Sequence, residues 1–193
     1  MYELLHQKFN EHIHLTDQEF DFCKTQFRPK KLRKRQYLLQ EGDTAKYTSF
    51  VEKGLLRTYS VDDKGHEHIL QFSQEGWWVG DLYSFLTNEP SVYNIEALED
   101  CELLQITREA WDNMLEKVPA LERYFRIIVQ NNLIATQRRL IGSLSETAEQ
   151  KYLKLQQSFP GCLQRVPQHM IASYLGISRE TLSRIRSQLA AKK

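Results

Sequence analysis

The sequence is poor in cysteine. Its 193 residues include three cysteines, Cys23, Cys101 and Cys162, which lie far apart and form no Cys-x-x-Cys pair. Disulfide frameworks, zinc sites and iron–sulfur clusters all need several thiols at suitable spacing. We therefore expect no disulfide framework, zinc site or iron–sulfur cluster, and interpret the cysteines as buried, reduced thiols of a cytoplasmic protein.

The sequence also has no long apolar run. No stretch approaches the roughly 18 consecutive apolar residues that a membrane-spanning helix needs, so no membrane partner is expected. The N-terminal sequence MYELLHQKFNEHIHL has no small-residue cleavage site, so we expect no signal peptide. With 41% apolar and 11% aromatic residues, the chain has the composition of an ordinary folded protein of one or two domains.

The net charge of +1 hides an uneven distribution. Residues 143–193 carry eight Lys or Arg against three Asp or Glu, which gives +5 and leaves −4 for residues 1–142. A basic terminal part on an acidic body is typical of a domain that binds a polyanion. Chance asymmetry is the alternative at this point.

The first half of the chain has the pattern of a β-roll. Apolar and polar residues alternate at helical spacing over residues 2–27, and LTDQEF within this segment has the form of a capping box. LLRTYSVDDKGHEHILQF then predicts a hairpin, and IEALEDCELLQIT predicts a second pair of strands around Glu99 and Asp100. Strands at this spacing without helices between them predict an antiparallel β-roll or jelly roll, and an α+β fold class overall.

A long helix follows the expected roll. After Pro119, the apolar residues of ALERYFRIIVQNNLIATQRRLIGSL are spread around more than one side. Such a helix packs on two partners, here its own roll and a second copy of itself. A buried helix in a monomer is the alternative. GSLSETAEQ then provides a hinge, so we divide the chain into a roll with its N-terminal helix (1–118), a long dimerisation helix (119–142) and a terminal domain (143–193).

The terminal domain contains the pattern of a helix-turn-helix, VPQHMIASYLGISRETLSRIRSQL. Gly176 permits a left-handed turn between two helices, and Ser178 caps the second one. The polar residues expected on the outer face of the second helix are Arg179, Glu180, Ser183, Arg184 and Arg186. Arginine can bind two acceptors of guanine and glutamate can accept from cytosine, so these residue types suit the DNA major groove. A helical hairpin with a solvated basic face is the alternative.

SRETLSRI resembles the recognition helix of the Crp/Fnr superfamily, the bacterial regulators typified by the catabolite activator protein. The order of elements is similar over nearly the whole chain, and GHEHILQFSQEGWWVGDLYSF resembles the corresponding part of the roll. RVPQHMIASYLGISRETLSRIR looks closest to Bacteroidetes-type members. The resemblance implies a cyclic-nucleotide-binding-like roll, a homodimer joined along the long helix, double-stranded DNA with a TGTGA-like palindrome, and RNA polymerase as a partner.

The resemblance also implies which residues contact DNA. The base-contacting positions of the family fall on Arg179, Glu180 and Arg184. The other residues expected at the DNA are Ser178, Thr181 and Ser183 on the second helix and Gln168 and His169 at the start of the first. Because nine residues follow Arg184, the β-hairpin wing of some relatives is expected to be reduced or absent.

The segment GDLYSFLTNEPSVY is the candidate effector site. In relatives that bind cyclic nucleotides, the turn at Gly80, Asp81 and Leu82 carries a glutamate for the ribose, and an arginine further along holds the cyclic phosphate. Ser91 and Val92 stand where that arginine and its neighbour belong. A buried phosphate without its arginine loses a strong charge-assisted interaction, so cyclic AMP is not expected to bind.

No cofactor is expected in this site, and its effector stays unidentified. The resemblance adds Thr136 on the long helix as a further contact, although an ordinary residue of a helix–helix seam is an equally good interpretation. Haem would need an axial ligand, and His66 and His68 are better interpreted as surface histidines.

Two other function classes are alternatives. A cupin-like enzyme would hold a metal in the roll, and HEH places His66 and His68 on one face of a strand. The only later histidine is His169 in the helix-turn-helix, so a third ligand is missing and no enzymatic activity is expected. The second alternative is a β-roll signalling module without DNA binding, against which Arg179, Glu180 and Arg184 argue.

Overall fold

The computed structural model describes residues 2–191, apart from the side chain of Cys162. Within this part of the chain, the strands form two four-stranded antiparallel sheets. The first has the order β1 (Arg28–Leu32), β8 (Cys101–Thr107), β3 (Tyr47–Lys53), β6 (Trp78–Val79). The second has the order β2 (Tyr37–Leu39), β7 (Asn94–Ala97), β4 (Leu56–Val61), β5 (Glu67–Ser73). Leu56, Ile95 and Leu103 are fully buried between the sheets, so the predicted antiparallel roll is confirmed.

One of the two predicted hairpins is correct and the other is wrong. β4 and β5 pair as expected, and Gly65 closes their turn with a positive φ of +79°. β7 and β8 do not pair with each other, because β7 joins β2 and β4 while β8 joins β1 and β3 in the other sheet. Glu99 and Asp100 therefore connect the two sheets. Inward-facing apolar residues look the same in both arrangements, and the pairing partners lie far away in sequence.

The helices before and after the strands cover the outer face of the first sheet. They are α1 (Glu3–Asn10), α2 (Asp17–Gln26) and α4 (Arg108–Lys117). The short helix α3 (Leu82–Thr87) lies within the roll sequence, between β6 and β7. Phe9 and Tyr124 meet edge to face at 4.8 Å in the cluster that joins these helices to Phe50 and Leu104 of the sheet. The predicted capping box at Thr16 is present.

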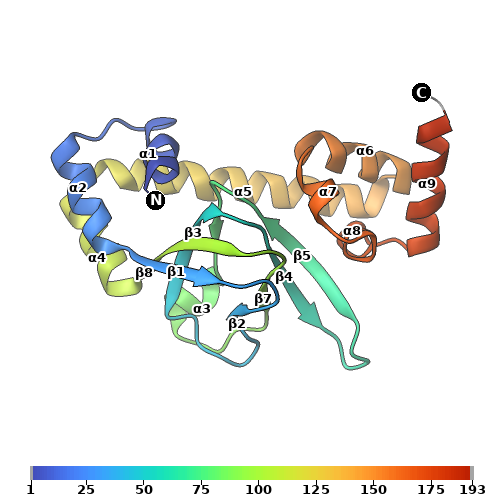
Figure 1. Ribbon diagram of the computed structural model, residues 1–193, viewed down its shortest axis with the longest axis horizontal. Helices are drawn as coiled ribbons and strands as arrows, with labels where there is room; N and C mark the ends of the chain where they lie inside the picture. Colours follow the sequence, from blue (N-terminus) through green and yellow to red (C-terminus); the bar gives the residue numbers. More distant parts are fainter. Residues whose placement is uncertain (1, 192–193) are drawn as a thin grey trace.

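α5 (Ala120–Ser145) crosses the whole molecule and connects its two ends (Figure 1). It continues through the buried Gly142 to Ser145, beyond the helix end predicted at residue 142, and the break at Glu146 and Thr147 lies within the predicted hinge GSLSETAEQ. Every residue from Val129 to Ile141 is exposed. The exposed apolar side chains of α5 are Val129, Leu133, Ile134, Leu140, Ile141 and Leu144. This face of the helix is uncovered in the single chain.

The terminal helices are α6 (Ala148–Ser158), α7 (Cys162–Arg165), α8 (Gln168–Leu175) and α9 (Arg179–Ala191). Their core contains Leu155, Ile171 and Leu182, and it is continuous with Tyr59 and Phe72 of the second sheet. The terminal helices therefore pack directly on the roll. After Thr107 the described residues contain helices only, and no helix in the described part is long and apolar enough to cross a membrane.

Two of the three cysteines are described in full. Cys23 and Cys101 are buried free thiols, as predicted. Burial raises the pKa of the Cys101 thiol to about 11, so it is protonated at neutral pH. The side chain of Cys162 lies outside the described residues.

Candidate functional site

The turn between α8 and α9 has the predicted helix-turn-helix geometry. Gly176 has a φ of +66°, in the left-handed region that L side chains rarely adopt. The Ile177 amide donates to the Ala172 carbonyl at 3.0 Å, which closes α8 with a Schellman-type bond. The Ser178 hydroxyl accepts from the Thr181 amide at 3.1 Å, as an N-cap of α9 should.

α9 buries one face and exposes the other. Leu182 and Ile185 are buried against α6 and α8. The exposed residues include Arg179, Glu180, Ser183, Arg184 and Arg186. Hydrogen bonds from its own backbone amide and from the Ser178 hydroxyl lower the pKa of Glu180, so its carboxylate is an ionised acceptor at neutral pH. Among the described residues, none forms an ion pair with Arg184, whose guanidinium is therefore available to a ligand.

The remaining candidate DNA contacts lie next to this face. Gln168 and His169 are exposed in the first turn of α8. Burial, the positive charge of Arg179 and that of Arg57 on β4 lower the pKa of His169, so its ring is neutral at neutral pH. The helix-turn-helix therefore gathers the eight predicted residues at the start of two adjoining helices. Their contact with DNA stays a prediction.

The candidate effector residues do not converge on one cavity. Asp81 caps α3, and its carboxylate accepts from the Ser84 amide at 3.2 Å and from the Ser91 hydroxyl at 2.8 Å. Both Asp81 and Ser91 are buried, so these two polar groups satisfy each other. Leu82 and Val92 are exposed. Thr136 is exposed on α5, where its hydroxyl bonds Asn132 at 3.4 Å.

A cavity of ≈ 590 Å³ lies beside this segment. Gly80 lines it together with Leu39, Ile95, Tyr47 and Lys46. Its volume suits a small ligand, and Lys46 provides a positive charge at its wall. The described residues that line it include no arginine.

His66 and His68 are engaged at the β4–β5 turn. Both rings bond Asp62, His68 through Nε2 at 3.0 Å and His66 through Nδ1 at 3.2 Å. The hydrogen bond from His68 is the main reason that the pKa of Asp62 lies below its usual range. The described residues contain no group of three or more His, Cys, Asp or Glu that could hold a metal ion.

Comparison with known proteins agrees with this architecture. The family model described as the cyclic nucleotide-binding domain matches residues 29–118, from the first strand of the roll to α4. The transcriptional activator protein FnrA of Stutzerimonas stutzeri is 28% identical over 169 residues, which cover 82% of this chain and 68% of that protein. The chain belongs to the Crp/Fnr superfamily of transcription regulators.

Solved structures show the same fold for this Crp/Fnr regulator. The global regulator CLP of Xanthomonas campestris matches 92% of this chain and 93% of its own, with a TM-score of 0.74 and 17% identity. FixK2 of Bradyrhizobium japonicum matches 86% of this chain and 85% of its own, with a TM-score of 0.73 and 20% identity. The specific likeness to Bacteroidetes members stays a prediction.

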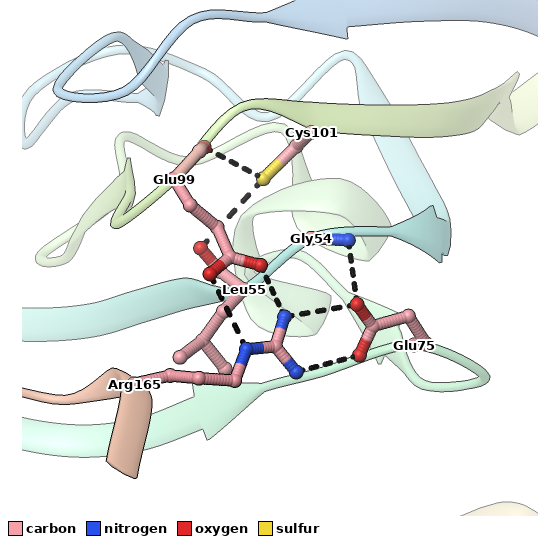
Figure 2. A network of polar contacts seen from close by, with 6 residues as sticks. All are labelled: Gly54, Leu55, Glu75, Glu99, Cys101 and Arg165. Atoms are coloured by element: carbon pink, nitrogen blue, oxygen red, sulfur yellow. Dashed lines mark hydrogen bonds and ion pairs between the residues drawn. The ribbon is translucent and has the colours of Figure 1, made fainter. Parts of the chain in front are cut away.

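One polar network of this Crp/Fnr regulator, which Figure 2 shows, has no signal in the sequence. Arg165, at the end of α7, donates two hydrogen bonds of 2.9 Å to Glu75 and also binds Glu99. The hydrogen bonds that Arg165 donates to Glu75 and Glu99 raise its pKa. Burial, the largest single influence, would raise the pKa of Glu75, but the hydrogen bonds from Arg165 and from the backbone amides of Glu75 and Gly54, together with the charge of Arg165, outweigh it and lower the pKa. The partners are 90 and 66 positions apart in the chain, so no local pattern could predict the network.

Proposed function

We propose that this Crp/Fnr regulator reads a palindromic DNA site as a homodimer and has no enzymatic activity. The observation that carries the proposal is the helix-turn-helix, with Arg179, Glu180 and Arg184 exposed together on α9. In this fold motif the second helix enters the major groove with its first residues at the base edges. The +5 charge of residues 143–193 supplies the attraction for phosphates.

The uncovered face of α5 supports the homodimer. Its exposed leucines and isoleucines would be buried if two copies of α5 lay side by side. A two-fold axis along this seam would place two α9 helices symmetrically, about 34 Å apart, for half-sites one turn of DNA apart. A TGTGA-like half-site and RNA polymerase as partner belong to the proposal through the family resemblance.

The test of DNA reading is selection of bound duplexes from a random pool, followed by titration of the selected site. We expect a palindromic preference in the wild type. Arg184→Ala should weaken specific binding by about 1–3 kcal/mol and relax the preference at one base pair of each half-site, because a guanine loses a bidentate donor.

Arg108→Ala is the matched control, since Arg108 is an exposed arginine on α4 that pairs with Asp112 away from α9. It should leave the selected sequence unchanged. A wild type that retains no sequence preference would refute the proposed function, and an Arg184→Ala variant with the wild-type preference would refute the role of Arg184.

We further propose that the effector of this protein is not cyclic AMP. The Asp81 carboxylate already binds Ser91, and no arginine lies between Arg57 and Arg108 in the sequence to pair with a cyclic phosphate. Effectors differ among similar proteins, since CLP is described as responsive to c-di-GMP. Isothermal titration with cyclic AMP should give no heat of binding at micromolar concentrations, and a micromolar or tighter site would contradict this prediction.

A further inference from the structure

Three turns of the roll converge on the guanidinium of Arg165 (Figure 2). The β5–β6 turn provides Glu75 and the β7–β8 turn provides Glu99. The β3–β4 turn provides the Gly54 amide, which donates to Glu75 at 2.8 Å. The Glu99 carbonyl accepts from the Cys101 thiol at 3.2 Å. Arg165 itself belongs to the terminal helices, so the network is a bridge between these helices and the roll.

The geometry of the bridge requires arginine. Arg165 uses Nε, Nη1 and Nη2 to contact all four carboxylate oxygens of Glu75 and Glu99. A planar guanidinium can do this, whereas a lysine ammonium cannot bind two carboxylates bidentately. The side chain of Arg165 is 30% exposed, so solvent weakens each ion pair. The bridge therefore defines an orientation more than it adds stability.

A second contact fixes the same orientation at the edge of the second sheet. β5 is an edge strand, and its Ile69 amide donates to the Ser173 hydroxyl of α8 at 3.0 Å. Ser173 donates in turn to the Glu67 carbonyl at 2.9 Å. The strand edge, which is otherwise open to water or another strand, is thus closed by α8.

Two aromatic contacts also join the terminal helices to the roll. Phe72 of β5 packs on Tyr174 of α8 at 5.3 Å, and Trp77 packs on Phe159 after α6 at 5.1 Å. The terminal helices therefore touch the roll through α6, α7 and α8. Because α8 leads directly into the turn at Gly176, this docking also determines where α9 lies.

We propose that Arg165, bound to Glu75 and Glu99, is a positioning residue for DNA reading: it clamps the helix-turn-helix on the roll and so sets the separation of the two α9 helices in the dimer. This inference rests on the proposed function. When the separation of the two α9 helices is fixed, the dimer binds most tightly to a duplex whose half-sites have the same separation. A loosened helix-turn-helix must be ordered when it binds DNA. This cost weakens binding to the best-spaced duplex and makes the affinities for duplexes of other spacing comparable to it.

The test compares wild type, Arg165→Gln, Arg165→Lys and Glu99→Gln with Arg108→Gln as the control. The probes are duplexes with inverted TGTGA repeats whose spacer changes by single base pairs, and a duplex with one half-site. We expect Arg165→Gln to bind the best-spaced probe about tenfold more weakly, to lose most of the spacing preference and to bind the single half-site as the wild type does. Arg165→Lys should not restore the spacing preference, and Glu99→Gln should lie between Arg165→Gln and wild type.

Hydrogen exchange of the Ile69 amide measures the docking without DNA. We expect this amide to exchange at least about tenfold faster in Arg165→Gln, while the Leu104 amide inside the roll keeps its protection and so shows that the roll is folded. Wild-type protein that binds no probe would overturn the proposed function and the positioning role with it. Unchanged Ile69 exchange in Arg165→Gln would overturn the clamp, and so would an unchanged spacing preference.

Discussion

Replacing Leu133 and Leu140 of α5 together by glutamate is expected to convert the protein from a dimer to a monomer. These side chains are 57% and 61% exposed in the single chain, and they lie seven positions apart, so they share one side of the helix. Burying a leucine contributes about 1.5–3 kcal/mol, and each leucine is present twice in a symmetric seam. Glutamate removes this gain and places like charges opposite each other. Sedimentation equilibrium measures the result directly.

Loss of the dimer should weaken binding to a palindromic duplex more than it weakens binding to a single half-site. A monomer holds one α9 helix, so its binding to a palindromic duplex should fall to the level of single half-site binding. Leu86→Glu is the matched control, because Leu86 is 48% exposed on α3 and the charge change per substitution is the same. A double variant that remains dimeric, or a wild type that is monomeric, would show that the α5 face is not the dimer seam.

The helix-turn-helix could be predicted because its determinants are local. Gly176 provides the left-handed turn, Ser178 caps the next helix, and Leu182 and Ile185 repeat at helical spacing. Each of these signals lies within a few residues of the next. The β4–β5 hairpin was predictable for the same reason, since its turn and both strands are contiguous.

The arrangement of the roll could not be predicted in the same way. β7 and β8 are adjacent in sequence but belong to different sheets, and their partners lie at the start of the roll. The sequence indicates Asp81 and Ser91 as two separate effector contacts, whereas the folding of α3 brings the Ser91 hydroxyl within 2.8 Å of the Asp81 carboxylate. Arg165 and its two glutamates look like ordinary surface charges until three turns and a helix are brought together.

Gly54→Ala is expected to destabilise the protein strongly. Gly54 has a φ of +104°, which costs a non-glycine residue about 1–2 kcal/mol. An added Cβ would also lie 2.5 Å from the Cys101 Sγ, 2.8 Å from the Asp100 carbonyl oxygen and 2.9 Å from the Cys101 Cα. Two of these three atoms are backbone, so the β3–β4 and β7–β8 turns must move apart, at about 1–3 kcal/mol more. Urea unfolding should show a total loss of roughly 2–5 kcal/mol.

Gly65→Ala separates the two causes of this loss. Gly65 has a φ of +79°, but nothing lies within 4 Å of its Cβ position, so only the backbone cost applies. Equal losses for the two variants would show that the turns around Cys101 are not closely packed. Gly54→Ala should also weaken the docking of the terminal helices, because the Gly54 amide binds Glu75, which in turn binds Arg165. Among molecules that remain folded, the Ile69 amide should therefore exchange faster in Gly54→Ala than in Gly65→Ala, a difference that global destabilisation alone would not confine to the docked strand edge.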